Sequence, residues 1–198
     1  MRILISIPTY DRRVDVDIVS GLLHLERAKI DFDLHFPISS LLARNRNLSV
    51  HECLTGGYDY LFFWDSDVGL EDGFMKKMLE TAYKQGAKIV CGAYKKKDDS
   101  GKYVLGMSNE KTYENLMSLK EPREVDAGGT GCMLIHRDVL MSLEDPWFTV
   151  VDGQNMFTMP EDFEFCRKAK LKGFKIYADP RFNTRHYGVK AYEHLREM

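Results

Sequence analysis

Two aspartates spaced two residues apart, Asp65 and Asp67, are the residues of this chain whose types and spacing point most directly to chemistry. They follow an apolar run, Tyr60–Trp64, that is typical of a buried strand. Carboxylates at the carboxyl end of such a strand lie at the edge where open α/β sheets bind ligands. Carboxylate oxygens suit Mg²⁺ or Mn²⁺, and these ions usually also hold substrate phosphates. Taken alone, the same residues also fit a surface turn with two solvated acids.

A second acidic pair, Glu161 and Asp162, stands at the start of a predicted helix. A carboxylate at the mouth of a pocket can act as a general base that takes a proton from a sugar or protein hydroxyl. Acids are also favoured at helix N-termini by the macrodipole and by free N–H groups, so plain capping is the alternative. The pair therefore carries two interpretations, a catalytic base and a helix cap.

Four further polar residues are candidates for binding a metal or a nucleotide. His186 follows the last predicted strand, and a neutral imidazole is a good Mn²⁺ ligand, whereas a packed or surface histidine is the alternative. The run Arg44-Asn45-Arg46 lies near the start of a predicted helix. An arginine there could neutralise a diphosphate or brace an acid, and the asparagine could contact a base or ribose, although an ordinary polar helix face fits as well.

Two loops could bring backbone or an aromatic ring close to a ligand. Thr9 and Tyr10 end the first predicted strand, where the tyrosine ring could stack on a nucleobase. The run Gly128-Gly129-Thr130-Gly131 allows close approach of backbone. Neither GxxxxGK[ST] nor GxGxxG occurs in the chain, so neither an ATP P-loop nor a dinucleotide fold is supported.

The order of predicted elements indicates an α/β protein. Strands and helices alternate through the first half of the chain, which predicts a largely parallel sheet with helices on its faces. The predicted strands are 2–7, 30–36, 60–64 and 88–92, and the predicted helices are 15–28, 39–54 and 72–85. Beyond a lysine-rich turn at 95–101 we expect an irregular stretch at 101–125, strands at 133–135 and 175–178, and helices at 137–143, 161–173 and 189–198.

Apolar spacing also predicts the inward side of the helix at 72–85, where the residues facing the core are Phe74, Met78, Leu79 and Ala82. In the helix at 15–28 the residues at apolar spacing are Val16, Val19, Leu22 and Leu23. In the helix at 39–54 they are Leu41, Leu42, Leu48 and Cys53, with Ser39 or Ser40 as the N-terminal cap.

Composition narrows the class of protein. The 198 residues suit one domain with a single core, and 44% hydrophobic and 29% charged residues are ordinary globular values. A net charge of −2 gives no general basic field toward nucleic acid or anionic lipid, so we expect no nucleic-acid partner. Four widely spaced cysteines without CxxC favour free thiols in a reducing compartment. No apolar run approaches the ~18 residues of a membrane span, so we expect a cytoplasmic protein without an integral membrane segment.

Taken together, the motifs resemble those of family-2-like glycosyltransferases of the GT-A fold. A "DxD" followed roughly one hundred residues later by "ED", and then by a C-terminal His, is the specific part of the resemblance. The likeness runs through nearly the whole chain. Its segments are 8–12 (PTYDR), 43–45 (ARN), 63–67 (FWDSD), 129–137 (GTGCMLIHR), 161–167 (EDFEFCR) and 186–188 (HYG).

The resemblance implies a single GT-A domain over residues 1–198. Its central sheet would be mostly parallel and flanked by helices, with a small irregular or antiparallel C-terminal part. Residues 1–94 would form the nucleotide-binding half and residues 95–198 the acceptor and catalytic half. The implied activity is a metal-dependent, inverting transfer of a sugar from a nucleotide-diphosphate sugar to an acceptor hydroxyl. The donor would be a UDP-hexose such as UDP-glucose, and the acceptor a glycan, lipid, protein or small molecule that the sequence does not identify.

The resemblance also assigns roles to residues. Asp162 would be the base, with Glu161 beside it, and Mn²⁺ or Mg²⁺ would be held by Asp65, Asp67 and His186. The residues implied for binding the donor nucleotide are Pro8, Thr9, Tyr10, Asp11, Arg44, Asn45, Asp65, Ser66, Asp67, Gly129 and Thr130.

Three other classes compete with this interpretation. The run Asp65-Ser66-Asp67-Val68 fits the first motif of haloacid-dehalogenase-type phosphatases, whose first Asp is a nucleophile, but here another strand and helix pair precedes it. A non-catalytic module that binds nucleotide sugars or carbohydrates would not need Asp162. A sugar-nucleotide pyrophosphorylase would need an N-terminal glycine-rich loop that this chain lacks.

Overall fold

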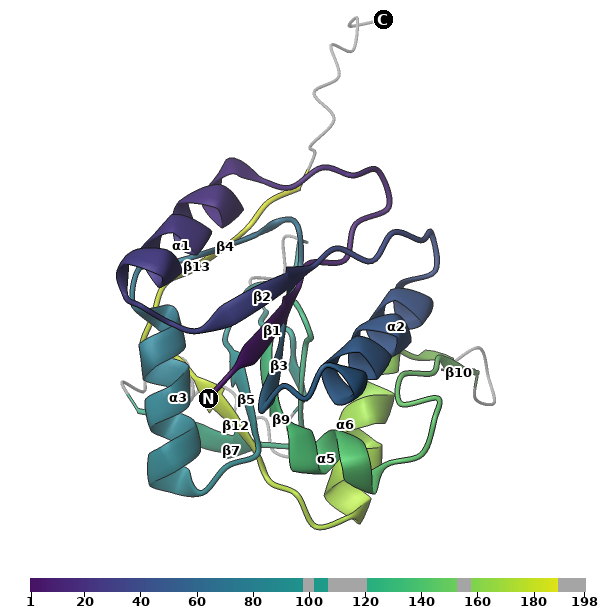
Figure 1. Ribbon diagram of the computed structural model, residues 1–198. Coiled ribbons are helices and arrows are strands. Elements are labelled where there is room, and N and C mark those ends of the chain that lie inside the picture. Colours follow the sequence, from purple (N-terminus) through teal and green to yellow (C-terminus); the bar gives the residue numbers. More distant parts are fainter. Residues whose placement is uncertain (98–101, 107–120, 153–157, 189–198) are drawn as a thin grey trace, which may run out of the picture.

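A seven-stranded sheet with helices on both faces forms the body of the protein (Figure 1). The computed structural model describes residues 1–97, 102–106, 121–152 and 158–188. The predicted helical tail at 189–198 and most of the predicted irregular stretch at 101–125 lie outside these residues. The α/β class and the single GT-A-like sheet expected from the sequence are confirmed.

Five of the seven strands run in one direction, and two run against them. The antiparallel strand β9 lies between β3 and β5, and the antiparallel strand β7 lies at one edge. Alternation of strands and helices predicted the parallel strands but not the place of β9. In sheet order the strands are β2 (Phe32–His35), β1 (Ile3–Ser6), β3 (Tyr60–Trp64), β9 (Cys132–His136), β5 (Ile89–Gly92), β12 (Ile176–Asp179) and β7 (Arg123–Val125).

The helices cover the two faces of the sheet and bury separate cores against it. Helices α1 (Val16–Arg27) and α3 (Phe74–Gln85) pack on one face, and α2 (Leu42–Thr55), α5 (Arg137–Ser142) and α6 (Glu161–Leu171) pack on the other. Strands β1, β5 and most of β3 are buried because both of their faces are covered. Within the described residues, no helix is long and apolar enough to cross a membrane.

Within the described residues, three short antiparallel pairs lie outside the main sheet. The resemblance implied a small irregular or antiparallel C-terminal part, but the individual strands of these pairs were not predicted. The pair β4–β13 joins the segment after Asp67 to the segment that ends at His186. The bounds are β4 (Val68–Leu70) with β13 (Thr184–His186), β6 (Leu105–Gly106) with β8 (Ala127–Gly128), and β10 (Val151–Asp152) with β11 (Thr158–Met159).

The predicted inner face of α2 is wrong in part. Leu41, at the cap position, is 65% exposed, and Leu42 and Leu48 are each 43% exposed, while Cys53 is buried as predicted. The helix starts at Leu42, and the Ser39 hydroxyl accepts a hydrogen bond from the Leu41 amide at 3.1 Å.

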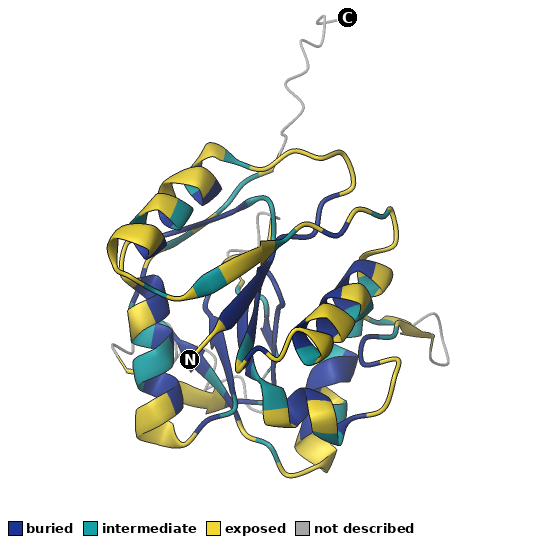
Figure 2. Ribbon diagram, viewed as in Figure 1, coloured by how far each residue is buried: buried dark blue, intermediate teal, exposed yellow. Residues whose placement is uncertain are grey.

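Helix α2 has buried and exposed positions along its length (Figure 2), and polar side chains take the buried positions where leucines were expected. Asn45, Arg46 and Ser49 are buried there. Ser49 lies 2.6 Å from the hydroxyl of Ser6 on β1, and Arg46 reaches Asp65 beyond β3. This face of α2 therefore lies against polar groups at the end of the sheet, and apolar spacing alone gave the wrong side.

In helix α1 the residues at apolar spacing face inward only in part. Leu22 is partly buried against the core. Val16, Val19 and Leu23 are exposed, whereas Ile18 and Leu25 are buried against the sheet. Gly21 also faces the core, because a Cβ there would lie 2.4 Å from the indole of Trp64. Close contact between the helix and this indole therefore fixes which side of α1 faces inward.

The four cysteines, Cys53, Cys91, Cys132 and Cys166, are buried free thiols, as expected from their spacing. Burial raises the pKa of Cys53 and of Cys166 to about 12. Their role is therefore that of small apolar side chains in the core.

Candidate functional site

The carboxyl ends of β1 and β3 and the start of α2 enclose a cavity of about 380 Å³. Asp65, Ser66 and Asp67 form one wall, and the N-terminal part of α2 with the preceding loop forms another. Seven of the eleven residues expected to bind a nucleotide lie here, together with Ser39, Ser40 and Leu42. Those seven are Pro8, Thr9, Tyr10, Asn45, Asp65, Ser66 and Asp67.

Two of the other expected nucleotide contacts lie outside the cavity wall. The carboxylate of Asp11 accepts hydrogen bonds from the Thr9 hydroxyl at 3.2 Å and the Arg13 amide at 3.1 Å, so it shapes the loop after β1. Arg44 lies on the exposed side of α2, one position from the lining residue Asn45.

The glycine-rich loop before β9 packs against protein. Gly129 and Thr130 are buried, and a Cβ on Gly129 would lie 2.1 Å from the hydroxyl of Tyr94. The same hydroxyl accepts a hydrogen bond from the Gly131 amide at 3.0 Å, and the Gly131 carbonyl accepts one from the Asp65 amide at 3.1 Å. The loop thus positions Asp65 from behind.

Arg46 is the most buried charged group near the cavity, and it pairs with an acid, as the sequence allowed for an arginine of this run, although the set of residues implied for binding the donor included only Arg44 and Asn45. Its side chain is 1% exposed, its Nη2 donates to Asp65 Oδ1 at 2.6 Å, and its guanidinium carbon lies 4.8 Å from the centre of the Phe63 ring. Its Nε and Nη1 atoms are buried without a hydrogen-bond partner. The available signal was the spacing of Arg46, Ser49, Val50 and Cys53 at i, i+3, i+4 and i+7, which marks the buried side of α2.

His186 and Asp67 approach each other at the end of the β4–β13 pair. The imidazole Nε2 lies 3.7 Å from Asp67 Oδ1. The Nδ1 atom lies 2.7 Å from the Lys95 carbonyl, and because that oxygen can only accept, Nδ1 carries the proton. In the neutral ring Nε2 then holds a free lone pair on the side of Asp67. A hydrogen bond from the second ring nitrogen to a carbonyl is the usual support of a metal-binding histidine.

The donor atoms present fit a divalent cation that is shared with a substrate. Among the described residues, no group of three or more His, Cys, Asp or Glu side chains could hold a metal ion. Asp67 and His186 converge as a pair, while Oδ1 of Asp65 is held by Arg46. Mg²⁺ commonly binds through one or two protein ligands and completes its shell with substrate phosphates and water. Two converging donors beside a nucleotide-sized cavity match that pattern.

The expected base, Asp162, has a perturbed pKa. It lies in the first turn of α6 beside Glu161. Burial and the neighbouring negative charge of Glu161 raise the pKa of Asp162 to about 6, although the positive charge of Arg46 opposes the shift. Its Oδ1 accepts a hydrogen bond from the Phe163 amide at 2.8 Å, so this oxygen also satisfies a free N–H group in the first turn of the helix. A carboxylate with this pKa takes up protons more readily near neutral pH than an exposed aspartate does.

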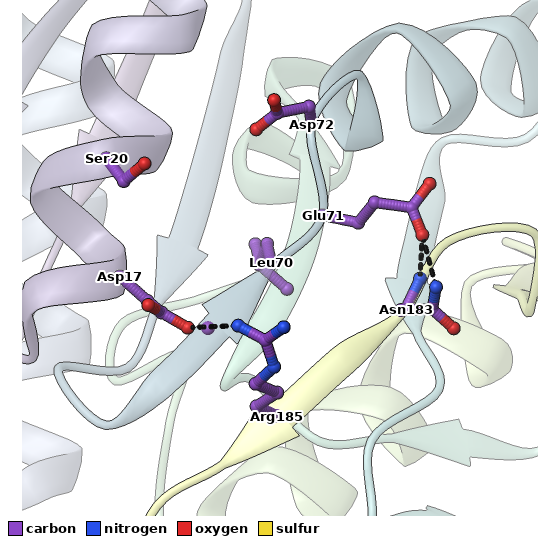
Figure 3. A pocket seen from close by; sticks show the side chains of 8 residues that line it. Asp17, Ser20, Leu70, Glu71, Asp72, Asn183 and Arg185 are labelled. Atoms are coloured by element: carbon purple, nitrogen blue, oxygen red, sulfur yellow. Dashed lines mark hydrogen bonds and ion pairs between the residues drawn. The ribbon is translucent and has the colours of Figure 1, made fainter.

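Another cavity, of about 310 Å³, lies between α1, the start of α3 and the β4–β13 pair (Figure 3). Its charged side chains already have partners in the protein. Arg185 donates to Asp17 at 3.0 Å, and the Asn183 amide side chain donates to Glu71 at 2.6 Å. Asp72 lies 2.5 Å from the imidazole of His24. Because these groups already have protein partners, we assign the cavity no ligand.

The sequence model described as "Glycosyl transferase family 2" matches residues 33–144, more than half of the chain. No curated protein sequence matches significantly.

Two solved structures share the fold. A197 from STIV is 24% identical, with a TM-score of 0.70, and the match covers 96% of this chain and 87% of that one. GalNAc-T7, solved with UDP, GalNAc and Mn²⁺, is 12% identical, with a TM-score of 0.56. That match covers 94% of this chain and 44% of that one, so this chain spans less than half of that protein.

Proposed function

Because the chain belongs to glycosyl transferase family 2, we propose that it moves a sugar from a nucleotide-diphosphate sugar to an acceptor hydroxyl. The observation that carries the proposal is the position of Asp65 and Asp67 in the cavity wall, with the imidazole of His186 3.7 Å from Asp67. Asp162 is close enough to Asp65 for their charges to interact. Residues 1–94 would bind the donor, and residues 95–198 would supply the base and the acceptor side. A UDP-hexose is the donor we propose, as the structure solved with UDP suggests.

The side chains of the cavity would bind and orient the donor. Tyr10, which is 78% exposed at the cavity rim, offers a ring face to a nucleobase, and Asn45 offers amide donors and acceptors. Asp67 and His186 would hold a divalent cation, which when bound would neutralise the charge of the departing diphosphate. Arg46 fixes one oxygen of Asp65 and leaves the other for the ligand.

Asp162 would take the proton of the acceptor hydroxyl as that oxygen attacks the anomeric carbon. The bond from the anomeric carbon to the diphosphate oxygen breaks, and the nucleotide leaves with its electron pair. With a single base on the face opposite the leaving group, the configuration of the anomeric carbon inverts. Positioning of the two reactants would supply much of the rate.

The experiment uses a panel of UDP-sugars and GDP-sugars with Mn²⁺ and water as the acceptor. Nuclear magnetic resonance would identify the anomer of the released sugar, and calorimetry would measure donor binding. We expect inversion, and we expect Asp162→Asn to retain donor binding while losing activity by about 10²–10⁴-fold, the usual contribution of a general base.

Asp138→Asn is the matched control, because Asp138 is also an acid in the first turn of a helix and pairs with Lys88 at 3.0 Å on another part of the surface. Asp67→Ala should lose Mn²⁺-dependent donor binding. Retention of configuration, or full activity of Asp162→Asn, would remove Asp162 from the role of base.

A further inference from the structure

The carboxylate of Asp67 already has a cation beside it. The ammonium of Lys97 donates a hydrogen bond to Asp67 Oδ2, while His186 faces Oδ1. The two side chains of this ion pair are partly exposed, Lys97 at 37% and Asp67 at 42%. Each carboxylate oxygen of Asp67, a proposed metal ligand, therefore faces one side chain, His186 or Lys97. The ammonium of Lys97 supplies positive charge where a divalent cation would otherwise supply it.

Backbone hydrogen bonds hold the segment that carries Lys97. The Val104 amide donates to the Tyr94 carbonyl at 2.9 Å, and the Lys96 amide donates to the Lys102 carbonyl at 2.8 Å. The Lys95 carbonyl also accepts a hydrogen bond from Nδ1 of His186 at 2.7 Å. The segment 94–97 thus orients His186 through its backbone and neutralises Asp67 through its last side chain.

The segment that ends at His186 is tied to the same aspartate. The amide of Tyr187 donates to the Asp67 carbonyl at 2.9 Å. A Cβ on Gly188 would lie 3.2 Å from Cδ of Lys97, so the lysine stem passes close to this backbone. Asp67, His186 and Lys97 are therefore held together by backbone, whereas the ammonium sits at the end of a long side chain that can move away while its segment stays fixed.

We propose that Lys97 competes with the divalent cation for Asp67 and, once displaced, binds the diphosphate of the donor. In the absence of a divalent cation Lys97 balances the charge of Asp67. When a divalent cation binds Asp67 and His186, it repels the ammonium of Lys97 at close range. The ammonium therefore leaves the carboxylate of Asp67. The anionic diphosphate beside the cation is then the nearest partner for the ammonium. This inference rests on the proposed function.

Direct metal binding separates this role from an ordinary surface ion pair. Mn²⁺ is titrated into the full chain without nucleotide and followed by electron paramagnetic resonance. Lys97→Met should tighten Mn²⁺ binding by about two- to fivefold, the range that a partly exposed ion pair supports. UDP is then titrated at saturating Mn²⁺ by calorimetry, and Lys97→Met should weaken UDP binding about fivefold or more, whereas Lys97→Arg should restore most of it.

Lys96→Met is the matched control, because Lys96 is the adjacent exposed lysine on the same segment, and neither affinity should change. Equal Mn²⁺ affinity in wild type and Lys97→Met would overturn the inference and leave the proposed function standing. Tighter Mn²⁺ binding without weaker UDP binding would overturn the diphosphate role. If Mn²⁺ bound neither protein, the inference and the metal site at Asp67 would both be wrong.

Discussion

Among the residues that the structure describes, two arginine–aspartate pairs each have one fully buried partner, and they differ in how completely their hydrogen bonds are made. Arg181 and Asp179 join the end of β12 to α3, and Arg46 and Asp65 join α2 to the end of β3. In the first pair the aspartate is fully buried and the arginine is 19% exposed. In the second pair the arginine is 1% exposed and the aspartate is 26% exposed.

The Arg181 pair is satisfied on all sides. Its Nε and Nη2 donate to the two oxygens of Asp179 at 2.9 and 2.8 Å, and its Nη1 donates to Glu80 at 3.1 Å. Asp179 also accepts the hydroxyl of Thr81 at 2.8 Å. These acceptors raise the pKa of Arg181 above its usual value. A network of this kind holds two elements together and leaves no group for a ligand.

The Arg46 pair is left incomplete. One nitrogen pairs with Asp65, and the other two have no partner. Buried polar groups are rarely left in this state, because each unmade hydrogen bond costs free energy. The comparison indicates that unsatisfied hydrogen-bonding capacity, rather than burial or charge alone, separates the candidate site from the structural network.

The largest expected effect is on stability, from Arg181→Met. Removing the arginine leaves Asp179 buried without a charge partner, so the free energy of unfolding should fall by about 3–5 kcal/mol. Urea denaturation measures it. Arg185→Met is the control, because Arg185 is 73% exposed in its pair with Asp17 and should change stability by no more than about 1 kcal/mol. Equal losses in the two variants would mean that the Arg181 network does not stabilise the fold as described.

An intermediate effect is expected from Arg46→Met. The change removes one charged hydrogen bond but also two unpartnered nitrogens, and Asp65 can reach water, so the free energy of unfolding should fall by only about 1.5–3 kcal/mol. UDP binding in the presence of Mn²⁺ should fall at least about tenfold, because Asp65 loses its fixed orientation, and Arg46→Lys should recover part of it. Scanning calorimetry measures the stability, and titration calorimetry measures the UDP binding. The comparison fails if Arg46→Met destabilises the protein as much as Arg181→Met and leaves UDP binding intact.

The smallest effect concerns Asp162, whose charge interacts with that of Arg46. Its pKa of about 6 in the folded state lies above the usual value, so ionisation disfavours folding, and the wild type should lose stability relative to Asp162→Asn as pH rises from about 4 to 6. The difference should change by about 2 kcal/mol over this range, because each pKa unit corresponds to about 1.4 kcal/mol and part of the shift is expressed only above pH 6.

Asp138→Asn gives a control of opposite sign. A hydrogen bond from Lys88 lowers the pKa of Asp138, so its stabilising contribution is lost as pH falls. Denaturation curves at pH 4, 6 and 8 measure both variants. If Asp162→Asn followed the wild type at every pH, Asp162 would lack the raised pKa.

The sequence predicted the parallel strands, and it predicted that most of the residues proposed to bind the donor lie together at one edge of the sheet, because apolar runs and the residues that end them are local signals. The loops after β1 and β3 met as expected, since carboxyl ends of parallel strands share one edge. The place of β9 depends on pairing between distant strands, which local periodicity does not contain. The burial of Arg46 was not predicted, because polar residues on an inner face contradict apolar spacing. Lys97 was missed because a lysine-rich turn is typical of a solvated surface.

The central place of β9 has a consequence for how the chain reaches its native state. Strands β3 and β5 both precede β9 in the sequence, yet they pair with it and not with each other. While the chain is being synthesised, a gap must therefore persist in the middle of the sheet until His136 has left the ribosome. Contacts of this range make folding slow and all-or-none. We expect a fragment that stops before β9 to misfold or aggregate, so the two halves must arise together as one cooperative unit.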